Sequence, residues 1–141
     1  MRAFRDGDRA AVEALWARVF PDEPPRNAPA LMLDHKLEVQ SELLLVGEVG
    51  GSDAAVVGAV MAGYDGVRGW LYHLAIAPEH RRRGFGAQLV RAAEARLRTL
   101  GCSKVNLQVR ASNREVVAFY QSVGYEVEER VSMGRRLEGE R

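Results

Sequence analysis

The hydrophobic positions in the first forty residues are spaced as in α-helices. One set of apolar side chains recurs three or four residues apart, which is the spacing of one helical face. This set comprises Val12, Leu15, Trp16, Val19 and Phe20. Four prolines between residues 21 and 29 end this helix. Residues Leu31 to Val39 predict a second, less regular helix.

The spacing then changes to that of β-strands. Three apolar segments, Leu43 to Glu48, Ala55 to Tyr64 and Trp70 to Ile76, are short, and turn residues separate them. The first turn is Gly50 to Asp53, and the second contains the Asp-Gly pair of a tight hairpin, Asp65-Gly66. We therefore expect antiparallel strands in this part of the chain.

Helices and strands alternate in the second half of the chain. Gly84 to Leu100 has the strongest helical pattern, and Lys104 to Arg110 alternates like a strand. A further helix begins at Ser112 or Asn113 and ends at Gly124. Two short strands, Glu126 to Arg130 and Ser132 to Leu137, complete the predicted order β-α-α-β-β-β-α-β-α-β-β. This order predicts a mixed α/β sheet with helices on its faces.

Composition narrows the protein class. A chain of 141 residues predicts one domain, residues 1–141. Its 47% hydrophobic and 28% charged residues argue against disorder, and its single cysteine, Cys102, excludes an internal disulfide. No apolar run is long enough to cross a membrane, and the N-terminus has no signal-peptide pattern. We expect a cytoplasmic protein that binds neither membrane nor, with a net charge of only +1, nucleic acid.

The most informative segment is Leu74 to Ala87, which runs from a strand through a loop into the strongest helix. The first backbone N–H groups of a helix lack partners inside the helix, and the helix dipole favours an anion there. Gly84 and Gly86 allow a close backbone approach, and three consecutive arginines, Arg81, Arg82 and Arg83, add positive charge. The segment therefore predicts a phosphate site. It matches neither the Walker loop nor the dinucleotide fingerprint.

Two motifs resemble those of the GNAT superfamily of N-acetyltransferases. Arg81-x-x-Gly84-x-Gly86 is similar to the acetyl-CoA loop of that family, and Ile76-Ala77-Pro78 stands before it as expected. The segment Asn113 to Tyr125 resembles the second family motif, with Val116 in place of the usual alanine. Within the superfamily, the chain looks like the small bacterial YpeA-type subgroup.

The resemblance implies a mixed, mostly antiparallel sheet of six to seven strands, splayed at its central strands, with about four helices on its faces. It implies acetyl-CoA as cosubstrate, an amine acceptor, no metal, and a monomer or homodimer. The strand Leu74, Ala75 and Ile76 would pair with the pantetheine arm, and the Leu74 N–H would polarise the thioester carbonyl. Asn113 would hydrogen-bond the pantetheine or its helix-facing groups, with an N-cap role as the alternative, and the Tyr120 hydroxyl would protonate the leaving thiolate. Backbone amides would hold the pyrophosphate, namely those of Arg81, Arg82, Arg83, Gly84, Phe85, Gly86 and Ala87.

The general base is the open question of the sequence. The strand Trp70 to Leu74 carries no carboxylate, and Gln108 stands where some relatives have glutamate. His73 has a suitable intrinsic pKa, but strict alternation along the strand puts it on one face with Leu71 and Ala75. Tyr72 and Tyr64, acting through water, are the alternatives. Trp16 and Trp70 are expected in the core.

Two classes of function remain. The first is direct acetyl transfer to a primary amine on a small molecule, peptide or protein, with the acceptor between residues 21–31, the hairpin 64–68 and the last two strands. The second is a non-catalytic module that binds acyl-CoA, which the missing carboxylate favours and Tyr120 disfavours. Nucleic-acid binding through residues 81–83 agrees poorly with the balanced charge.

Overall fold

The computed structural model describes residues 1–51 and 54–138, so Ser52 and Asp53 of the first predicted turn lie outside the described residues. Contacts divide the chain into two compact units, Met1–Gln108 and Val109–Arg141. The first unit contains the sheet and three of the helices. No helix in the described part of the chain is long and apolar enough to cross a membrane.

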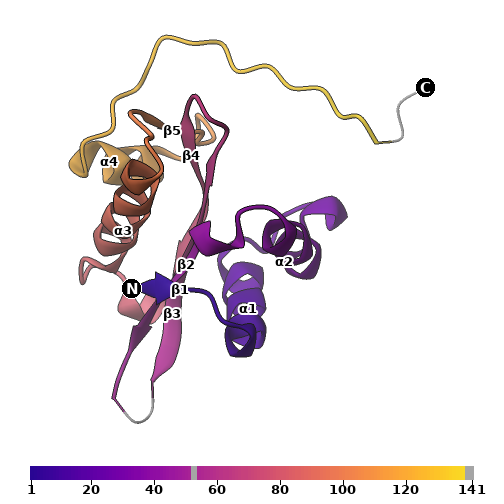
Figure 1. The fold of residues 1–141 in the computed structure, drawn as a ribbon, viewed down its shortest axis with the longest axis vertical. Coiled ribbons are helices and arrows are strands. Elements are labelled where there is room, and N and C mark those ends of the chain that lie inside the picture. Colours follow the sequence, from indigo (N-terminus) through magenta and orange to yellow (C-terminus); the bar gives the residue numbers. More distant parts are fainter. Residues whose placement is uncertain (52–53, 139–141) are drawn as a thin grey trace. The chain divides into compact units, whose positions relative to one another are not determined.

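The first unit is built on a five-stranded sheet (Figure 1). The strands lie in chain order and are antiparallel, except for the parallel pair β4 and β5. Their bounds are β1 Arg2–Ala3, β2 Leu44–Val49, β3 Ala55–Tyr64, β4 Gly69–Ile76 and β5 Val105–Leu107. The three predicted apolar strands therefore form as β2, β3 and β4.

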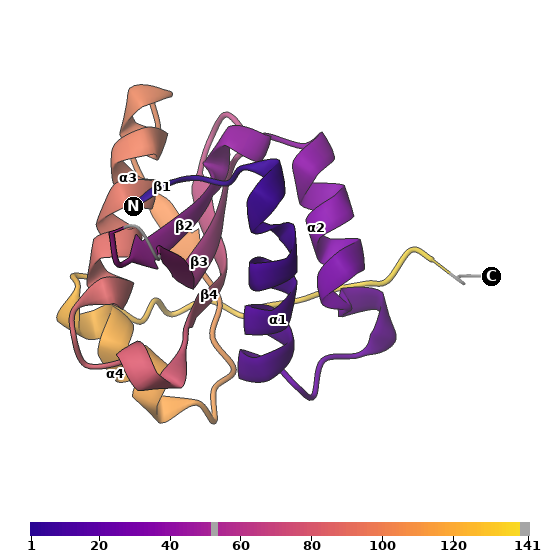
Figure 2. The same cartoon turned by 90° about the horizontal axis from the view of Figure 1, so that it is seen from below.

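Helices cover both faces of this sheet (Figure 2). Helices α1, Arg9–Val19, and α2, Pro29–Glu38, lie on one face, and α3, Phe85–Thr99, lies on the other. Trp16 is 1% exposed and belongs to the main core cluster, as its helical spacing predicts. Leu89 and Leu97 are the buried anchors of α3. The removal of such side chains from water is the main stabilising contribution of the two layers.

The parallel pair β4 and β5 separates early. Register partners are Gly69 with Val105, Trp70 with Asn106 and Leu71 with Leu107, and the ladder ends there. Within the first unit, residues Tyr72 to Ile76 of β4 therefore have β3 on one side and no paired strand on the other. This confirms a sheet that is splayed at its central strands. The strand predicted over Lys104 to Arg110 is shorter, at Val105–Leu107, because its partner changes direction beyond Leu71.

That change of direction is a β-bulge at His73. Ala59 of β3 pairs with Ala75 and Met61 with Tyr72, so two residues of β4, His73 and Leu74, oppose one residue of β3. His73 has φ of 51°, in the left-handed region. A bulge of this kind bends its strand and redirects a side chain.

The second unit contains α4, Arg114–Ser122. Asn113 is its N-cap, and the Oδ1 of Asn113 accepts the Val116 N–H at 3.3 Å. The strands predicted at Glu126 to Arg130 and Ser132 to Leu137 do not form among the described residues. Every side chain from 126 to 138 is exposed, and alternation of apolar residues cannot make a strand without a hydrogen-bonding partner. The described sheet consequently has five strands, not six or seven.

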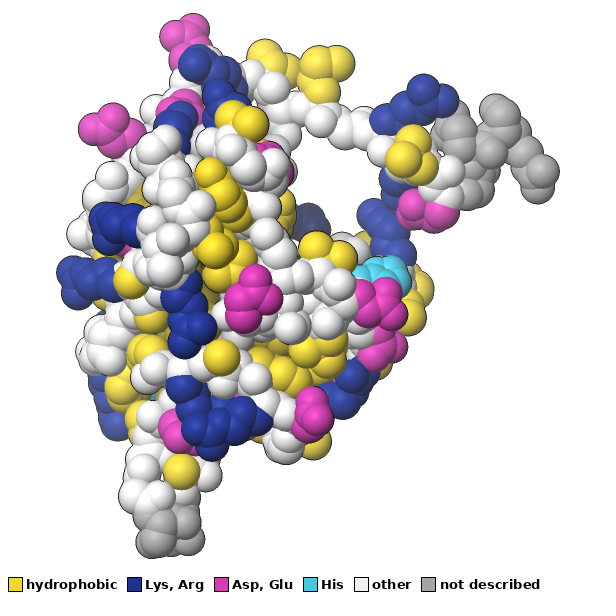
Figure 3. Space-filling model, viewed as in Figure 1, with side chains coloured by type: hydrophobic (Ala, Val, Ile, Leu, Met, Phe, Trp, Pro, Cys, Tyr) yellow, Lys and Arg dark blue, Asp and Glu magenta, His cyan; other side chains and the backbone are white. Residues whose placement is uncertain are grey.

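The surface carries both signs of charge. On the face in Figure 3, Lys and Arg side chains are interspersed with Asp and Glu side chains. This agrees with the 20 basic and 19 acidic residues of the sequence.

Candidate active site

The loop between β4 and α3 forms an anion site from backbone groups. After a short 3-10 helix at Pro78–His80, Arg82 and Gly84 both take left-handed conformations, with φ of 63° and 80°. Helix α3 begins at Phe85, and its first internal bond joins the Gln88 N–H to the Gly84 carbonyl at 3.0 Å. The N–H groups of residues 85, 86 and 87 therefore have no partner inside the helix. An anion placed here meets these groups and the positive end of the helix dipole.

Space and charge around this loop suit a phosphate. A Cβ built on Gly84 would meet nothing within 4 Å, so a ligand can approach the backbone there. Arg81, Arg82 and Arg83 are exposed, and the Arg81 Nε donates to the Ile76 carbonyl at 3.2 Å. That bond holds the beginning of the loop against the end of β4.

A salt bridge fixes the same loop to α1. The Arg18 guanidinium donates to both carboxylate oxygens of Glu79, at 2.6 and 3.1 Å. The Arg18 hydrogen bonds lower the pKa of Glu79 to about 2, and both side chains are about half exposed. The pair orients the loop more than it stabilises the fold, because exposed ion pairs contribute little.

The unpaired edge of β4 presents backbone groups beside this loop. The Ala77 N–H donates to Val57 of β3 at 2.8 Å, so by strand alternation Ala75 also faces β3. The N–H and C=O groups of Leu74 and Ile76 consequently point to the opposite edge. The bond from Arg81 to the Ile76 carbonyl agrees with this direction. An extended ligand chain laid along this edge would meet the Leu74 amide.

His73 points toward α1. Its ring lies edge-on to Trp16, with 5.6 Å between ring centroids, and tilted against Phe20 at 4.7 Å. It therefore shares a face with Ala75 of the core cluster, but not with Leu71. Leu71 follows Gly69 on the other face, where a Cβ on Gly69 would meet Leu97 of α3 at 3.0 Å. The expectation that all three share one face is wrong because the bulge shifts the alternation by one residue. Burial lowers the pKa of His73.

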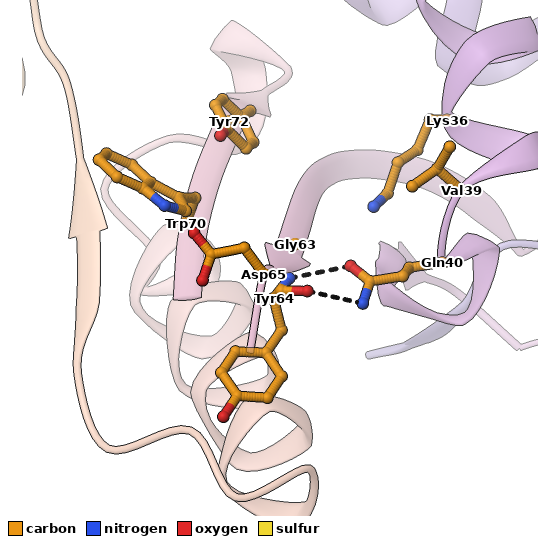
Figure 4. A pocket seen from close by; sticks show the side chains of 8 residues that line it. All are labelled: Lys36, Val39, Gln40, Gly63, Tyr64, Asp65, Trp70 and Tyr72. Carbon is orange, nitrogen blue, oxygen red and sulfur yellow. Dashed lines mark hydrogen bonds between the residues drawn. The ribbon is translucent and has the colours of Figure 1, made fainter. Parts of the chain in front are cut away.

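A second feature is a pocket of about 510 Å³ on the α2 side of the sheet (Figure 4). It lies between the C-terminal end of α2 and the hairpin of β3 and β4. Its lining residues are Lys36, Val39, Gln40, Gly63, Tyr64, Asp65, Trp70 and Tyr72. Its volume is in the range of small-molecule sites.

One wall of the pocket is made by side chains that replace a strand. Strand β2 begins at Leu44, opposite Met61, so Ala62 and Tyr64 of β3 extend past it. The Lys36 Nζ donates to the Ala62 carbonyl at 2.5 Å. The Gln40 amide then donates to the Tyr64 carbonyl and accepts the Tyr64 N–H, both at 2.9 Å (Figure 4). Two side chains thereby satisfy backbone groups that a longer β2 would pair.

The opposite wall is aromatic and carries one carboxylate. The rings of Trp70 and Tyr72 are stacked, with centroids 6.5 Å apart, and Tyr72 is 50% exposed. Asp65 Oδ1 accepts the N–H groups of Arg68, at 2.8 Å, and Val67, at 2.7 Å. These backbone hydrogen bonds, that of Arg68 first, lower the pKa of Asp65, so this carboxylate is ionised at neutral pH. Burial raises the pKa of the Tyr72 phenol.

Sequence reasoning found only part of this pocket. It proposed Tyr72 and Tyr64, and the structure brings both to the lining. It missed Lys36 and Gln40, which have no motif and reach the site only because α2 packs beside β3. Trp70 was expected in the core but lines the pocket, since Trp70 and Tyr72 lie on the same face of β4. The 21–31 loop and the last two strands contribute no lining residue in the described part of the chain.

In the second unit, Tyr120 is buried, at 8% exposure. Its ring contacts those of Phe119 and Tyr125, at centroid distances of 5.1 and 5.6 Å. Burial raises the pKa of Tyr120 to about 12, so its hydroxyl holds its proton throughout the neutral range. Asn113, the other predicted residue of this motif, caps α4 with its side chain.

Known proteins are similar to this chain in sequence. The sequence pattern of the Acetyltransferase (GNAT) family matches residues 9–125, which extend over both units. "Acetyltransferase YE1169" of Yersinia enterocolitica is 39% identical over 137 residues, covering 97% of this chain and 94% of that protein. "Acetyltransferase ECA0875" of Pectobacterium atrosepticum is also 39% identical, with the same coverage. The YpeA-type subgroup is not named among these relatives and stays a prediction.

Solved structures show the same fold. Ard1 from Thermoplasma volcanium has a TM-score of 0.77 and 27% identity, covering 90% of this chain and 82% of that one. AAC(6')-Iy, solved with a bisubstrate analogue, CoA-S-monomethyl-acetylneamine, has a TM-score of 0.77 and 20% identity, covering 96% of both chains. With a family match over residues 9–125 and relatives 39% identical over 97% of its length, the chain belongs to the Acetyltransferase (GNAT) family and is an acetyltransferase.

Proposed function

We propose that the protein transfers the acetyl group of acetyl-CoA directly to a primary amine. The observation that supports this most strongly is the edge of β4 beyond Leu71, which pairs with no strand of the first unit and begins at Tyr72 of the pocket. Cosubstrate and acceptor sites on one strand allow both substrates to be bound at once. Positioning of this kind accounts for a large share of rate enhancement in two-substrate reactions.

The cosubstrate would lie along the edge of β4 and across the start of α3. The N–H groups of residues 85 to 87 bind the pyrophosphate, with the arginines 81 to 83 around it. The pantetheine arm follows Leu74 to Ile76, and the Leu74 N–H donates to the thioester oxygen, which gains negative charge during attack. The structure of AAC(6')-Iy with a CoA analogue supports this choice of cosubstrate.

The amine attacks the thioester carbonyl, the C–S bond breaks, and the electron pair leaves on the CoA sulfur. The amine gives up one proton, and the thiolate gains one. We propose that water linked to Tyr72 and Tyr64 takes the first proton, because β4 carries no carboxylate and His73 is packed among aromatic rings. The Tyr120 hydroxyl donates toward the sulfur, and Asn113 binds the pantetheine.

The cosubstrate loop is tested with Gly86→Val. The isopropyl group added in the first turn of α3 would fill the space that the pyrophosphate needs, while the helix still forms. Ala95→Val is the matched control, because Ala95 is an exposed position of the same helix far from its beginning. We expect Gly86→Val to lose CoA binding by calorimetry and Ala95→Val to keep it. A folded Gly86→Val protein that binds CoA as tightly as Ala95→Val contradicts the loop assignment.

Catalysis itself is tested by incubating the wild-type protein with acetyl-CoA and a panel of small amines, amino acids and peptides, with detection of acetylated product. We expect product from at least one class of amine. CoA binding without any product would favour the non-catalytic module instead.

A further inference from the structure

Lys36 places a positive charge in the pocket that we propose for the acceptor. It is half-buried on α2, and among the described residues it has no salt-bridge partner. It is also the one cationic side chain among the described lining residues. Half-buried charges without a counter-ion are uncommon in folded proteins because desolvation is unfavourable.

The bond to Ala62 does not explain why this residue carries a charge. An ammonium has three donor hydrogens, and the Ala62 carbonyl takes one of them. A neutral amide could satisfy the Ala62 carbonyl equally well. The Gln40 amide does this for the Tyr64 carbonyl, two residues further along β3. Burial lowers the pKa of Lys36, which Glu42 only partly offsets, so the ammonium is poorly solvated as it stands.

Asp65, the carboxylate of the pocket, does not neutralise this charge. It belongs to the hairpin on the other wall, and its Oδ1 accepts the N–H groups of Val67 and Arg68. Figure 4 shows Asp65 beside Trp70, whereas the Lys36 ammonium extends from α2 on the opposite side. The space between them is where a ligand would lie.

We infer that the acceptor amine also carries a carboxylate, which binds the Lys36 ammonium while the body of the acceptor packs on Trp70 and Tyr72. This inference rests on the proposed function and narrows its acceptor to amines that carry a carboxylate, such as free amino acids. Tyr72 is two residues from Leu74 along the strand, at most about 7 Å, because the bulge at His73 lies between them. A compact molecule with its acid and amine a few bonds apart suits that spacing.

The charge also disfavours polycationic acceptors. Like charges brought together across a binding site weaken binding, so an aminoglycoside would be repelled by Lys36. A free amino acid, by contrast, would form a charge-assisted hydrogen bond, which is stronger than a neutral one.

The test compares each acceptor with its own carboxamide. L-Phenylalanine with L-phenylalaninamide and L-methionine with L-methioninamide are suitable pairs, and the measured quantity is the ratio of kcat/KM for acid over amide. Amidation changes the reactivity of the amine as well. We therefore compare how this ratio changes between wild type and variants, because the intrinsic reactivity of each acceptor then cancels.

Three variants separate charge from structure. Lys36→Gln keeps a donor for Ala62 but removes the charge, and Lys36→Arg keeps the charge. Gln40→Leu removes the two hydrogen bonds between the Gln40 side chain and the Tyr64 backbone without changing the charge. We expect Lys36→Gln to lower the acid-over-amide ratio about 10- to 100-fold, in KM more than in kcat, since hydrogen bonds to charged groups are worth that much. Lys36→Arg should restore most of the ratio, and Gln40→Leu should leave it unchanged.

Two results would overturn the inference. One is an acid-over-amide ratio that Lys36→Gln leaves at the wild-type value in a folded, CoA-binding protein. The other is an equal drop in Gln40→Leu, which would assign Lys36 a structural role. Acetylation of some amines with either result would leave the proposed function intact, whereas no acetylation of any amine by the wild type would overturn the proposed function itself.

Discussion

Removal of one hydroxyl at Tyr120 tests how the leaving thiolate is stabilised. Burial raises the pKa of Tyr120 to about 12, whereas a thiol has a pKa of about 8.5. Complete proton transfer from the phenol to the thiolate would be unfavourable by about 3.5 pKa units, or about 4.8 kcal/mol. In the proposed mechanism the phenol would therefore act as a hydrogen-bond donor to the sulfur as the C–S bond breaks, and not as a full proton donor. A hydrogen bond to a charged group contributes about 1.5–3 kcal/mol.

We therefore expect Tyr120→Phe to lower kcat about 10- to 100-fold, with CoA affinity nearly unchanged, because the bond strengthens only as charge develops. Release of free thiol gives kcat and KM, and calorimetry gives the CoA affinity. Tyr125→Phe is the matched control, since it removes a hydroxyl from a ring 5.6 Å from that of Tyr120.

The refuting result is specific. A Tyr120→Phe enzyme whose kcat equals that of Tyr125→Phe at every pH from 6 to 9 would show that the Tyr120 hydroxyl has no role in the transfer. A loss confined to CoA affinity would assign the hydroxyl to binding instead.

Two further predictions concern His73. If water carries the amine proton, activity should rise toward alkaline pH without an inflection near 6.5, and His73→Gln should retain that pH–rate profile. The opposite result would be a wild-type inflection at pH 6–7 that His73→Gln abolishes with a large loss of rate. That result would make His73 the base. Burial lowers the pKa of His73 below its unfolded value of about 6.5, so its contribution to the free energy of unfolding should be complete above that pH and lost as the pH falls toward the folded pKa. Urea unfolding between pH 5 and 8 measures the free energy of unfolding as a function of pH. If its slope against pH is the same in His73→Gln as in the wild type, this prediction is contradicted.

The cosubstrate side of the site follows from local sequence rules. Gly84 takes a left-handed φ and α3 begins one residue later, as the glycine spacing and the strong helical pattern predict. The Asp65-Gly66 pair likewise forms the predicted hairpin between β3 and β4. These features depend on residues close together in the chain, so their patterns are visible without any knowledge of tertiary contacts.

Local sequence rules do not predict the bulge at His73. A period of two along β4 predicts opposite faces for Tyr72 and His73, yet both point to the side of α1 and α2. No glycine or proline in Trp70 to Ala75 marks the irregularity. It is seen only in the register between β3 and β4, where a histidine occupies a left-handed conformation. The faces on which candidate bases were assigned were consequently wrong by one residue.

The prediction of two C-terminal strands was wrong for a related reason. Residues Val127, Val131 and Met133 are apolar but exposed, at 75%, 86% and 89%. An apolar side chain favours a strand only where another element covers it and another strand accepts its backbone hydrogen bonds. Sequence alternation specifies neither partner, so it predicted strands that the described residues do not form.

The proposed acceptor pocket combines both difficulties. Lys36 and Gln40 take the place of a strand because β2 begins one residue too late to pair with Ala62. Lys36 of α2 and Gln40, two residues after the end of α2, supply the missing bonds. Side chains in that position can be exchanged without altering the sheet, provided that one donor for the Ala62 carbonyl remains. If the inference on Lys36 holds, the motif at 81–86 can stay constant while residue 36 selects the charge of the acceptor. On this reasoning, relatives with the same phosphate loop and a neutral residue at the position of Lys36 should prefer acceptors that lack a carboxylate.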